Sequence, residues 1–165
     1  MSLKIVTASF DHLPELAPLF DAYRVFYGQP SDVEQARAFL HERFMHGESI
    51  VFIAMLEDGT QIRAVGFTQL YPMFSSVSLR RMWILNDLYV EADVRGQRVG
   101  ERLIERAVQL AKESGAKGIQ LETAHTNTSG QKLYERLGFE REDLEYRTYF
   151  LTTEESKNSS RDFPL

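Results

Sequence analysis

The sequence contains no cysteine among its 165 residues. This absence excludes disulfide bonds, thiol nucleophiles and cysteine-ligated metal sites. Long apolar runs are also missing, because no stretch approaches the roughly 18 apolar residues of a membrane span. The N-terminal segment MSLKIVTASF lacks the apolar core of a secretory signal. We therefore expect a soluble, cytoplasmic protein with no membrane partner.

An excess of basic residues is lacking as well. The formal net charge is −5 at pH 7, which argues against nucleic acid as a partner and suits a neutral or cationic small substrate. The histidines are scattered without metal-ligand spacing, so we expect no metal; they are His12, His41, His46 and His125. The chain length fits one domain with a hydrophobic core.

Common nucleotide-binding and hydrolase motifs are absent. Neither G-x-G-x-x-G nor G-x-x-x-x-G-K-[ST] occurs, which excludes those phosphate loops. Ser129 and Gly130 do not lie in a G-x-S-x-G setting, which argues against serine hydrolase chemistry. The chain has instead the segment EADVRGQRVGERLIERAV at 91–108. In it, two glycines stand among arginines between an apolar run and an amphipathic helical pattern.

Hydrophobic periodicity predicts strands and helices over most of the chain. We expect strands near 3–9, 49–56, 62–71, 80–90 and 117–124, with two further pieces in FEREDLEYRTYFLT at 139–152. Helices are expected near 11–27, 31–46, 98–114 and 128–137. Ser31 and Glu34 form a capping box at the start of the second helix.

The order of these elements predicts an α/β fold. The hairpin over 49–71 implies antiparallel strands, and the strand–helix–strand unit over 80–124 implies a parallel pair. We expect a mixed central sheet of six to seven strands, flanked on both faces by about four helices. A single domain over 1–152 would be followed by a flexible tail at 153–165.

The turn at 95–100 has the properties of a phosphate site. Backbone N–H groups at a helix N-terminus bind phosphate, with the helix dipole behind them. Gly96 and Gly100 allow close approach of the backbone, while Arg95 and Arg98 can donate charge-assisted hydrogen bonds. Ligands of α/β sheets bind at this end of a parallel strand. The same residues are equally compatible with a basic loop that only caps the helix.

Two segments together resemble the GNAT superfamily of N-acetyltransferases. RGQRVG at 95–100 is similar to the family's coenzyme motif R/Q-x-x-G-x-G/A, with Arg98 where glycine is usual. NTSGQKLYERLGF at 127–139 is similar to N-x-x-[AG]-x-x-[LF]-Y-x-x-x-G-F. LNDLYV at 85–90 looks most like L-E-D-[FL]-[FY]-V of the spermidine/spermine acetyltransferase branch, with Asn86 in place of the glutamate.

The resemblance implies acetyl-CoA as co-substrate and a homodimer. The coenzyme would lie between the strands at 80–90 and 117–124. Its pyrophosphate would accept hydrogen bonds from the turn, and its pantetheine would pair with the strand before the turn. The implied coenzyme-binding residues are Leu88, Tyr89, Val90, Arg95, Gly96, Gln97, Arg98, Val99, Gly100, Asn127 and Tyr134.

Amine attack on a thioester requires loss of the ammonium proton and protonation of the leaving thiolate. By the resemblance, Tyr134 supplies the second proton from its phenol. Asp87 and Glu122 lie on the two expected cleft strands and could relay the first proton or attract a cation. Each could equally be a strand-end polar residue or an ion-pair partner. In strict alternation Asp87 shares its strand face with Tyr89 and Trp83.

Aromatic residues are candidates for holding the acceptor. Tyr23, Phe26 and Tyr27 fall on one helical face at i, i+3 and i+4, and aromatic faces bind amines. Trp83 is a similar candidate, and all four also fit as core residues. The expected function is acetyl transfer to a primary amine of a small molecule. The alternatives are a coenzyme-binding sensor without turnover and an enzyme that acetylates protein or peptide amines.

Overall fold

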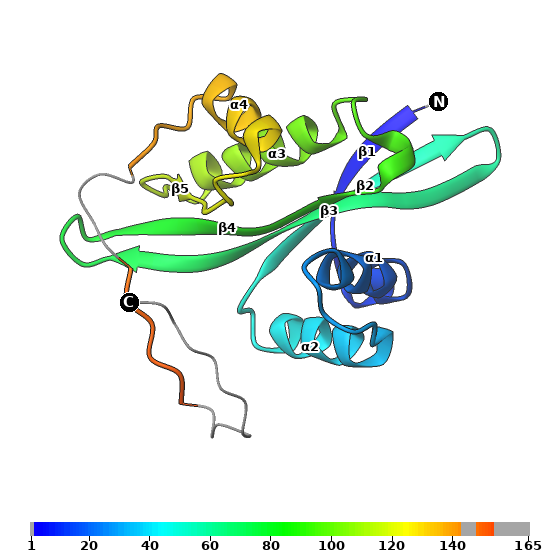
Figure 1. The fold of residues 1–165 in the computed structure, drawn as a ribbon, viewed down its shortest axis with the longest axis horizontal. Helices are drawn as coiled ribbons and strands as arrows, with labels where there is room; N and C mark the ends of the chain where they lie inside the picture. The colour runs from blue at the N-terminus through cyan, green and yellow to red at the C-terminus, as the bar shows by residue number, and fades with distance from the viewer. Residues whose placement is uncertain (1, 143–147, 154–165) are drawn as a thin grey trace. The chain divides into compact units, whose positions relative to one another are not determined.

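The computed structural model describes residues 2–142 and 148–153 (Figure 1). The chain divides into two units, 1–124 and 125–165, which are described separately. The single domain expected over 1–152 stays a prediction. Apart from Thr153, the expected tail lies outside the described residues.

The first unit is built on a mixed sheet with the strand order β1-β2-β3-β4-β5. Antiparallel pairing joins β1 (Ser2–Thr7), β2 (Ile50–Asp58), β3 (Gln61–Ser75) and β4 (Arg80–Val90). The two-residue β5 (Ile119–Gln120) pairs with β4 in parallel. The mixed α/β fold predicted from the sequence is therefore confirmed.

The number of strands differs from the prediction. The described residues contain five strands instead of six to seven. Residues 139–142 and 148–152, where two more pieces were expected, carry no strand, and 143–147 lie outside the described residues. The apolar alternation there is present, but it forms no ladder within the described part of the chain.

Helices cover both faces of the sheet in the first unit. α1 (Leu13–Phe26) and α2 (Val33–Met45) lie on one face, and α3 (Val99–Glu113) lies on the other (Figure 1). The core under α1 and α2 includes the fully buried Leu16, Leu40, Ile53 and Phe67. α4 (Thr128–Arg136) belongs to the second unit. Within the described residues, no helix is long and apolar enough to cross a membrane.

A carboxylate on α1 fixes the start of α2. Asp21 accepts hydrogen bonds from the Ser31 hydroxyl at 2.6 Å and from the Asp32 backbone N–H at 2.8 Å. Asp32 is the N-cap of α2, and its side chain accepts from the Gln35 N–H at 2.9 Å. The predicted Ser31 capping box is therefore wrong, because the Ser31 hydroxyl donates to α1 instead.

A β-bulge in β4 determines which side chains share a face. Gln69 pairs with Asp87 and Leu70 pairs with Leu85, so Asn86 is the extra residue. Trp83 points toward α3, where its Nε1 donates to Ser114 Oγ at 2.9 Å, whereas Asp87 lies on the α1 side. The expectation that Trp83 and Asp87 share a face is wrong, because an inserted residue reverses strict alternation.

Candidate active site

Among the described residues, the edge of β4 that faces β5 is paired between Arg81 and Ile84. In the part of the chain that the structure describes, no strand pairs with this edge from Leu85 to Val90. Residues 121–124, expected as strand, have no regular structure. The peptide groups at Leu88 to Val90 therefore lie along an edge that an extended ligand can pair with.

The turn after β4 contains two residues whose backbone lies in the left-handed region. Gly96 has φ +77° and Arg98 has φ +62°, both in the left-handed region. Gln97 lies exposed between them. Arg98 is the N-cap of α3, so the N–H groups of Val99 and Gly100 point out of the N-terminal end of the helix. Arg98 thus occupies a conformation that glycine adopts without steric cost.

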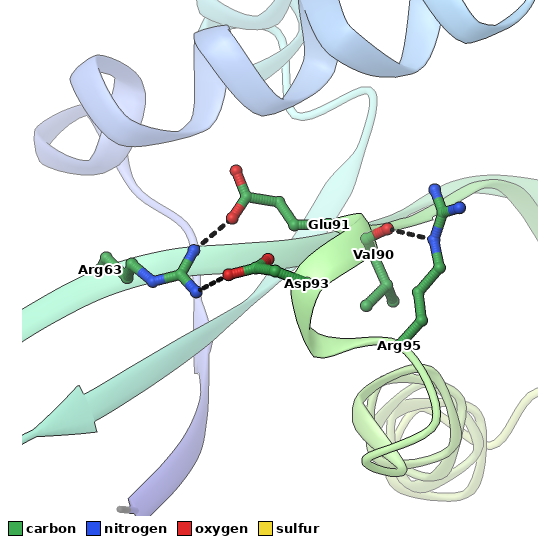
Figure 2. Close-up of polar contacts among 5 residues, drawn as sticks. All are labelled: Arg63, Val90, Glu91, Asp93 and Arg95. Carbon is green, nitrogen blue, oxygen red and sulfur yellow. Dashed lines mark hydrogen bonds and ion pairs between the residues drawn. The ribbon is translucent and has the colours of Figure 1, made fainter.

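Polar contacts hold this turn in place (Figure 2). Arg63 of β3 pairs with the carboxylates of Glu91 and Asp93. The Nε of Arg95 donates to the Val90 carbonyl at 3.0 Å, and Figure 2 shows its two terminal nitrogens directed away from that carbonyl. Arg95 can therefore hold the turn and still present two donor groups to an anion.

Asp87 is the centre of a buried polar cluster on the α1 face. The residue is 4% exposed. Its Oδ2 accepts from Gln69 Nε2 at 2.7 Å and its Oδ1 from Asn86 Nδ2 at 3.0 Å, while the Tyr23 phenol also donates to the carboxylate. Burial raises the pKa of Asp87, and these three donors oppose the rise.

Tyrosine phenols surround this carboxylate. Burial, reinforced by the charge of Asp87, raises the pKa of Tyr23 far above its ordinary value and that of Tyr71 to about 12. Both phenols are therefore protonated at neutral pH and can donate hydrogen bonds. The Tyr27 ring lies 4.9 Å from that of Tyr23, and the Phe26 ring lies 5.3 Å from that of Tyr27. The rings of Tyr27 and Phe26 are exposed, and Tyr27 contacts Tyr23, which donates to the buried carboxylate.

Trp83 and Glu122 lie differently from what the strand pattern suggests. Trp83 is buried on the α3 side, with the Arg81 guanidinium 5.2 Å from its ring centroid. Glu122 is exposed and follows the end of β5. Strand alternation therefore does not orient Glu122. The structure brings together Asp87 and Tyr23, with Phe26 and Tyr27 beyond them, but not Trp83.

Sequence reasoning did not identify Gln69 and Tyr71. Gln69 is fully buried, and its Oε1 has no hydrogen-bond partner in the described residues. The one signal in the sequence that could have identified Gln69 is its polar amide inside the apolar run AVGFTQLY at 64–71. A buried amide usually has a specific polar partner, which here is Asp87.

The second unit carries Asn127 and Tyr134. Asn127 is the N-cap of α4, and its Oδ1 accepts from the Gly130 N–H at 3.1 Å. A Cβ on Gly130 would lie 2.4 Å from Asn127 Nδ2, so glycine makes room for this cap. Tyr134 is half-buried, with its ring centroid 6.0 Å from that of Phe139. The motif at 127–139 is thus a capped helix followed by a turn.

Comparison with known proteins matches residues 16–139 to the model of the Acetyltransferase (GNAT) family. An uncharacterized N-acetyltransferase of Bacillus subtilis, YhfO, is 46% identical over 136 residues, which are 82% of this chain and 88% of the relative. The crystal structure of a probable acetyltransferase is 43% identical with a TM-score of 0.83, covering 92% of this chain and 99% of that one. A predicted acetyltransferase from Clostridium acetobutylicum, solved with acetyl-CoA, has a TM-score of 0.70 at 15% identity, covering 90% and 96% of the two chains.

Proposed function

The chain belongs to the GNAT family of acetyltransferases, and on that premise we propose that it transfers the acetyl group of acetyl-CoA to a primary amine of a small molecule. Family membership makes the protein an acetyltransferase enzyme and implies acetyl-CoA as its co-substrate. The observation that carries the acceptor class is the buried carboxylate of Asp87, which is held by neutral donors and lies beside aromatic rings.

The coenzyme part of the proposal rests on β4 and the turn after it. The pantetheine would pair with the edge at Leu88 to Val90, where no strand competes within the described residues. The pyrophosphate would accept from backbone N–H groups between Gly96 and Gly100, at the N-terminus of α3. The terminal nitrogens of Arg95 would add charge-assisted hydrogen bonds.

An ammonium group is the acceptor chemistry that Asp87 suits. The side chains that hydrogen-bond it are neutral, so its ionised form keeps a negative charge that a cationic amine can offset. Tyr23, Tyr27 and Phe26 would contact the rest of the acceptor by cation–π and apolar packing. The polyamine class of the spermidine/spermine branch is one member of this group of acceptors.

The proposed mechanism is direct attack within a ternary complex. Asp87 accepts the ammonium proton, directly or through water, and a backbone N–H of β4 stabilises the oxyanion. Tyr134 protonates the leaving thiolate, a role that rests on its place in the motif and on its phenolic donor. Glu122 is exposed and is the second candidate for the relay of the amine proton.

Release of CoA from acetyl-CoA over a panel of small amines tests this function. We expect turnover with at least one primary amine and none with its N-acetylated form. Coenzyme binding without turnover on any amine would instead support a sensor, an alternative favoured by Arg98 in the position of a glycine. Turnover restricted to peptides would indicate a protein acetyltransferase.

Replacing Tyr134 with phenylalanine tests the proton donor. We expect kcat to fall about 10-fold or more with little change in coenzyme affinity, as is usual for a general acid. Tyr149→Phe is the matched control, because Tyr149 lies in the same unit and its side chain is exposed. An unchanged kcat in Tyr134→Phe would exclude the assignment.

A further inference from the structure

The turn proposed to bind the coenzyme phosphates is preceded by two carboxylates. Glu91 and Asp93 lie between the end of β4 and Arg95, and their side chains are 35% and 61% exposed. Two negative charges beside an anion site repel the ligand that the site must bind. A phosphate site at this turn therefore requires a group that offsets them.

Arg63 occupies the position from which both carboxylates can be neutralised. It lies on β3, and its guanidinium divides between them: Nη1 pairs with Glu91, and Nη2 lies 2.5 Å from Asp93 Oδ2 (Figure 2). A backbone hydrogen bond also joins β3 to this turn, because the Glu91 N–H donates to the Val65 carbonyl at 2.9 Å. The Arg63 side chain thus links Glu91, the N-cap of the short 3-10 turn Ala92–Val94, to Asp93, the middle residue of that turn.

The charge balance of the turn depends on this arginine. Arg98 forms an ion pair with Glu101 at 2.5 Å. Arg95 donates a hydrogen bond to the Val90 carbonyl, which carries no charge. Arg63, Arg95 and Arg98 make three positive charges against three negative charges on Glu91, Asp93 and Glu101. Without Arg63 these six residues carry two positive charges against three negative charges, and Glu91 and Asp93 lose the cation that pairs with them.

We propose that Arg63 is a positioning residue for acetyl-CoA that keeps the turn receptive to phosphate by neutralising Glu91 and Asp93 and fixing their side chains. It acts through these two carboxylates and does not contact the coenzyme. This role rests on the proposed function, because it takes the turn at 95–100 as the phosphate site.

The variant Arg63→Gln tests the role. We expect the KM for acetyl-CoA to rise about fivefold, with kcat and the KM for the amine nearly unchanged, as suits an exposed ion-pair network. The increase should shrink as the salt concentration rises, because screening weakens the repulsion. An acetyl-CoA KM equal to that of the unmodified protein at low salt would overturn the proposal.

A triple variant separates neutralisation from simple structural support. In Arg63→Gln combined with Glu91→Gln and Asp93→Asn, we expect acetyl-CoA affinity to return to within about twofold of the starting value, because no negative charge is left uncovered. A triple variant as weak as Arg63→Gln alone would exclude the charge-based role. Arg63→Lys keeps the charge and should lose less affinity than Arg63→Gln.

Two controls keep this inference distinct from the proposed function. Lys4→Gln removes an equal charge from another exposed pair, with Glu57 at 2.9 Å, and should leave the KM for acetyl-CoA unchanged. Arg95→Ala removes a proposed direct contact. If Arg95→Ala weakens coenzyme binding and Arg63→Gln does not, only the role of Arg63 fails. If neither variant weakens binding, the phosphate site itself is placed wrongly and the coenzyme part of the proposed function fails.

Discussion

At the scale of single residues, Asp87 is a carboxylate that burial makes harder to ionise. Its pKa is raised above the ordinary value of about 3.9, so it loses its proton at a higher pH than an exposed carboxyl does. Attraction of an ammonium and removal of its proton both need the ionised form. Activity with the amine should therefore fall as the pH drops through the raised pKa.

The substitution Asp87→Asn checks this dependence. We expect kcat/KM for the amine to fall about 100-fold and the acidic limb of its pH profile to disappear. Asp58→Asn, at an exposed position of the β2–β3 hairpin, should change neither quantity. An acidic limb that persists in Asp87→Asn would assign it to another group.

Arg98 combines an unfavourable backbone conformation with an exposed side chain. At φ +62° it pays a steric cost that glycine does not, so Arg98→Gly should raise Tm by about 2 °C in a thermal melt. Arg98→Ala keeps the Cβ and should not gain this stability. If Arg98→Gly also weakens acetyl-CoA binding while Arg98→Lys does not, the Arg98 side chain contributes charge to the phosphate site.

Sequence reasoning identified Asp87 and correctly placed Tyr89 on its strand face, where the Tyr89 ring lies 6.5 Å from that of Tyr23, but it wrongly added Trp83 to that face. Asp87 could be recognised as a candidate base from the sequence, because a carboxylate inside an apolar strand is unusual. Its partner Gln69 could not be recognised, because their contact depends on the register of two strands and the residues are 18 positions apart. The bulge at Asn86 cannot be recognised from the alternation of apolar and polar residues. Trp83 was therefore assigned to the face of Asp87, although Trp83 packs toward α3.

At the scale of elements, the connection between α1 and α2 depends on an ionised Asp21. The hydrogen bond from Ser31, then that from the Asp32 N–H, lowers its pKa. Because the folded pKa lies below the unfolded value of about 3.9, the stabilisation is complete above that value and is lost as pH falls through the folded pKa.

We therefore expect Asp21→Asn to destabilise the protein at pH 7 by about 1 to 3 kcal/mol, the range for hydrogen bonds to a charged group. The difference from the unmodified protein should narrow near pH 3. Urea unfolding at both pH values measures it, with the exposed Asp58→Asn as control. An equal loss at both pH values would show that the charge of Asp21 is not involved.

Element positions were predictable where a pattern continued over several residues. The hairpin β2–β3, strand β4 and helix α3 all lie where periodicity placed them. The ends of strands and helices were less predictable, because they depend on hydrogen-bonding partners that are distant in the sequence. The strand expected at 117–124 is reduced to Ile119–Gln120, where the pairing with β4 exists. Ser31 is a good cap by residue type, but Asp21, ten positions earlier, takes its hydroxyl.

At the scale of the whole molecule, the family could be recognised from the sequence because each of its motifs is a short continuous segment. Each motif occupies one turn or one short helix, at 95–100 and 127–139. The acceptor was not readable, because its proposed contacts come from α1, β3 and β4 and are assembled only by folding. The homodimer also stays a prediction, which light scattering would test against the 19.0 kDa mass of one chain.

Coenzyme binding should appear as a change in the stability of the entire protein. A ligand that binds only the folded state stabilises it by about 2.7 kcal/mol at a concentration 100 times its Kd. For a chain of this length, that corresponds to a rise in Tm of about 5 to 10 °C, measurable by calorimetry or dye binding. The rise should grow with the logarithm of the acetyl-CoA concentration and should be smaller in Arg95→Ala at equal concentration. If acetyl-CoA leaves Tm unchanged at millimolar concentration, the β4 edge and the turn at 95–100 do not form a working coenzyme site, although the family fold is present.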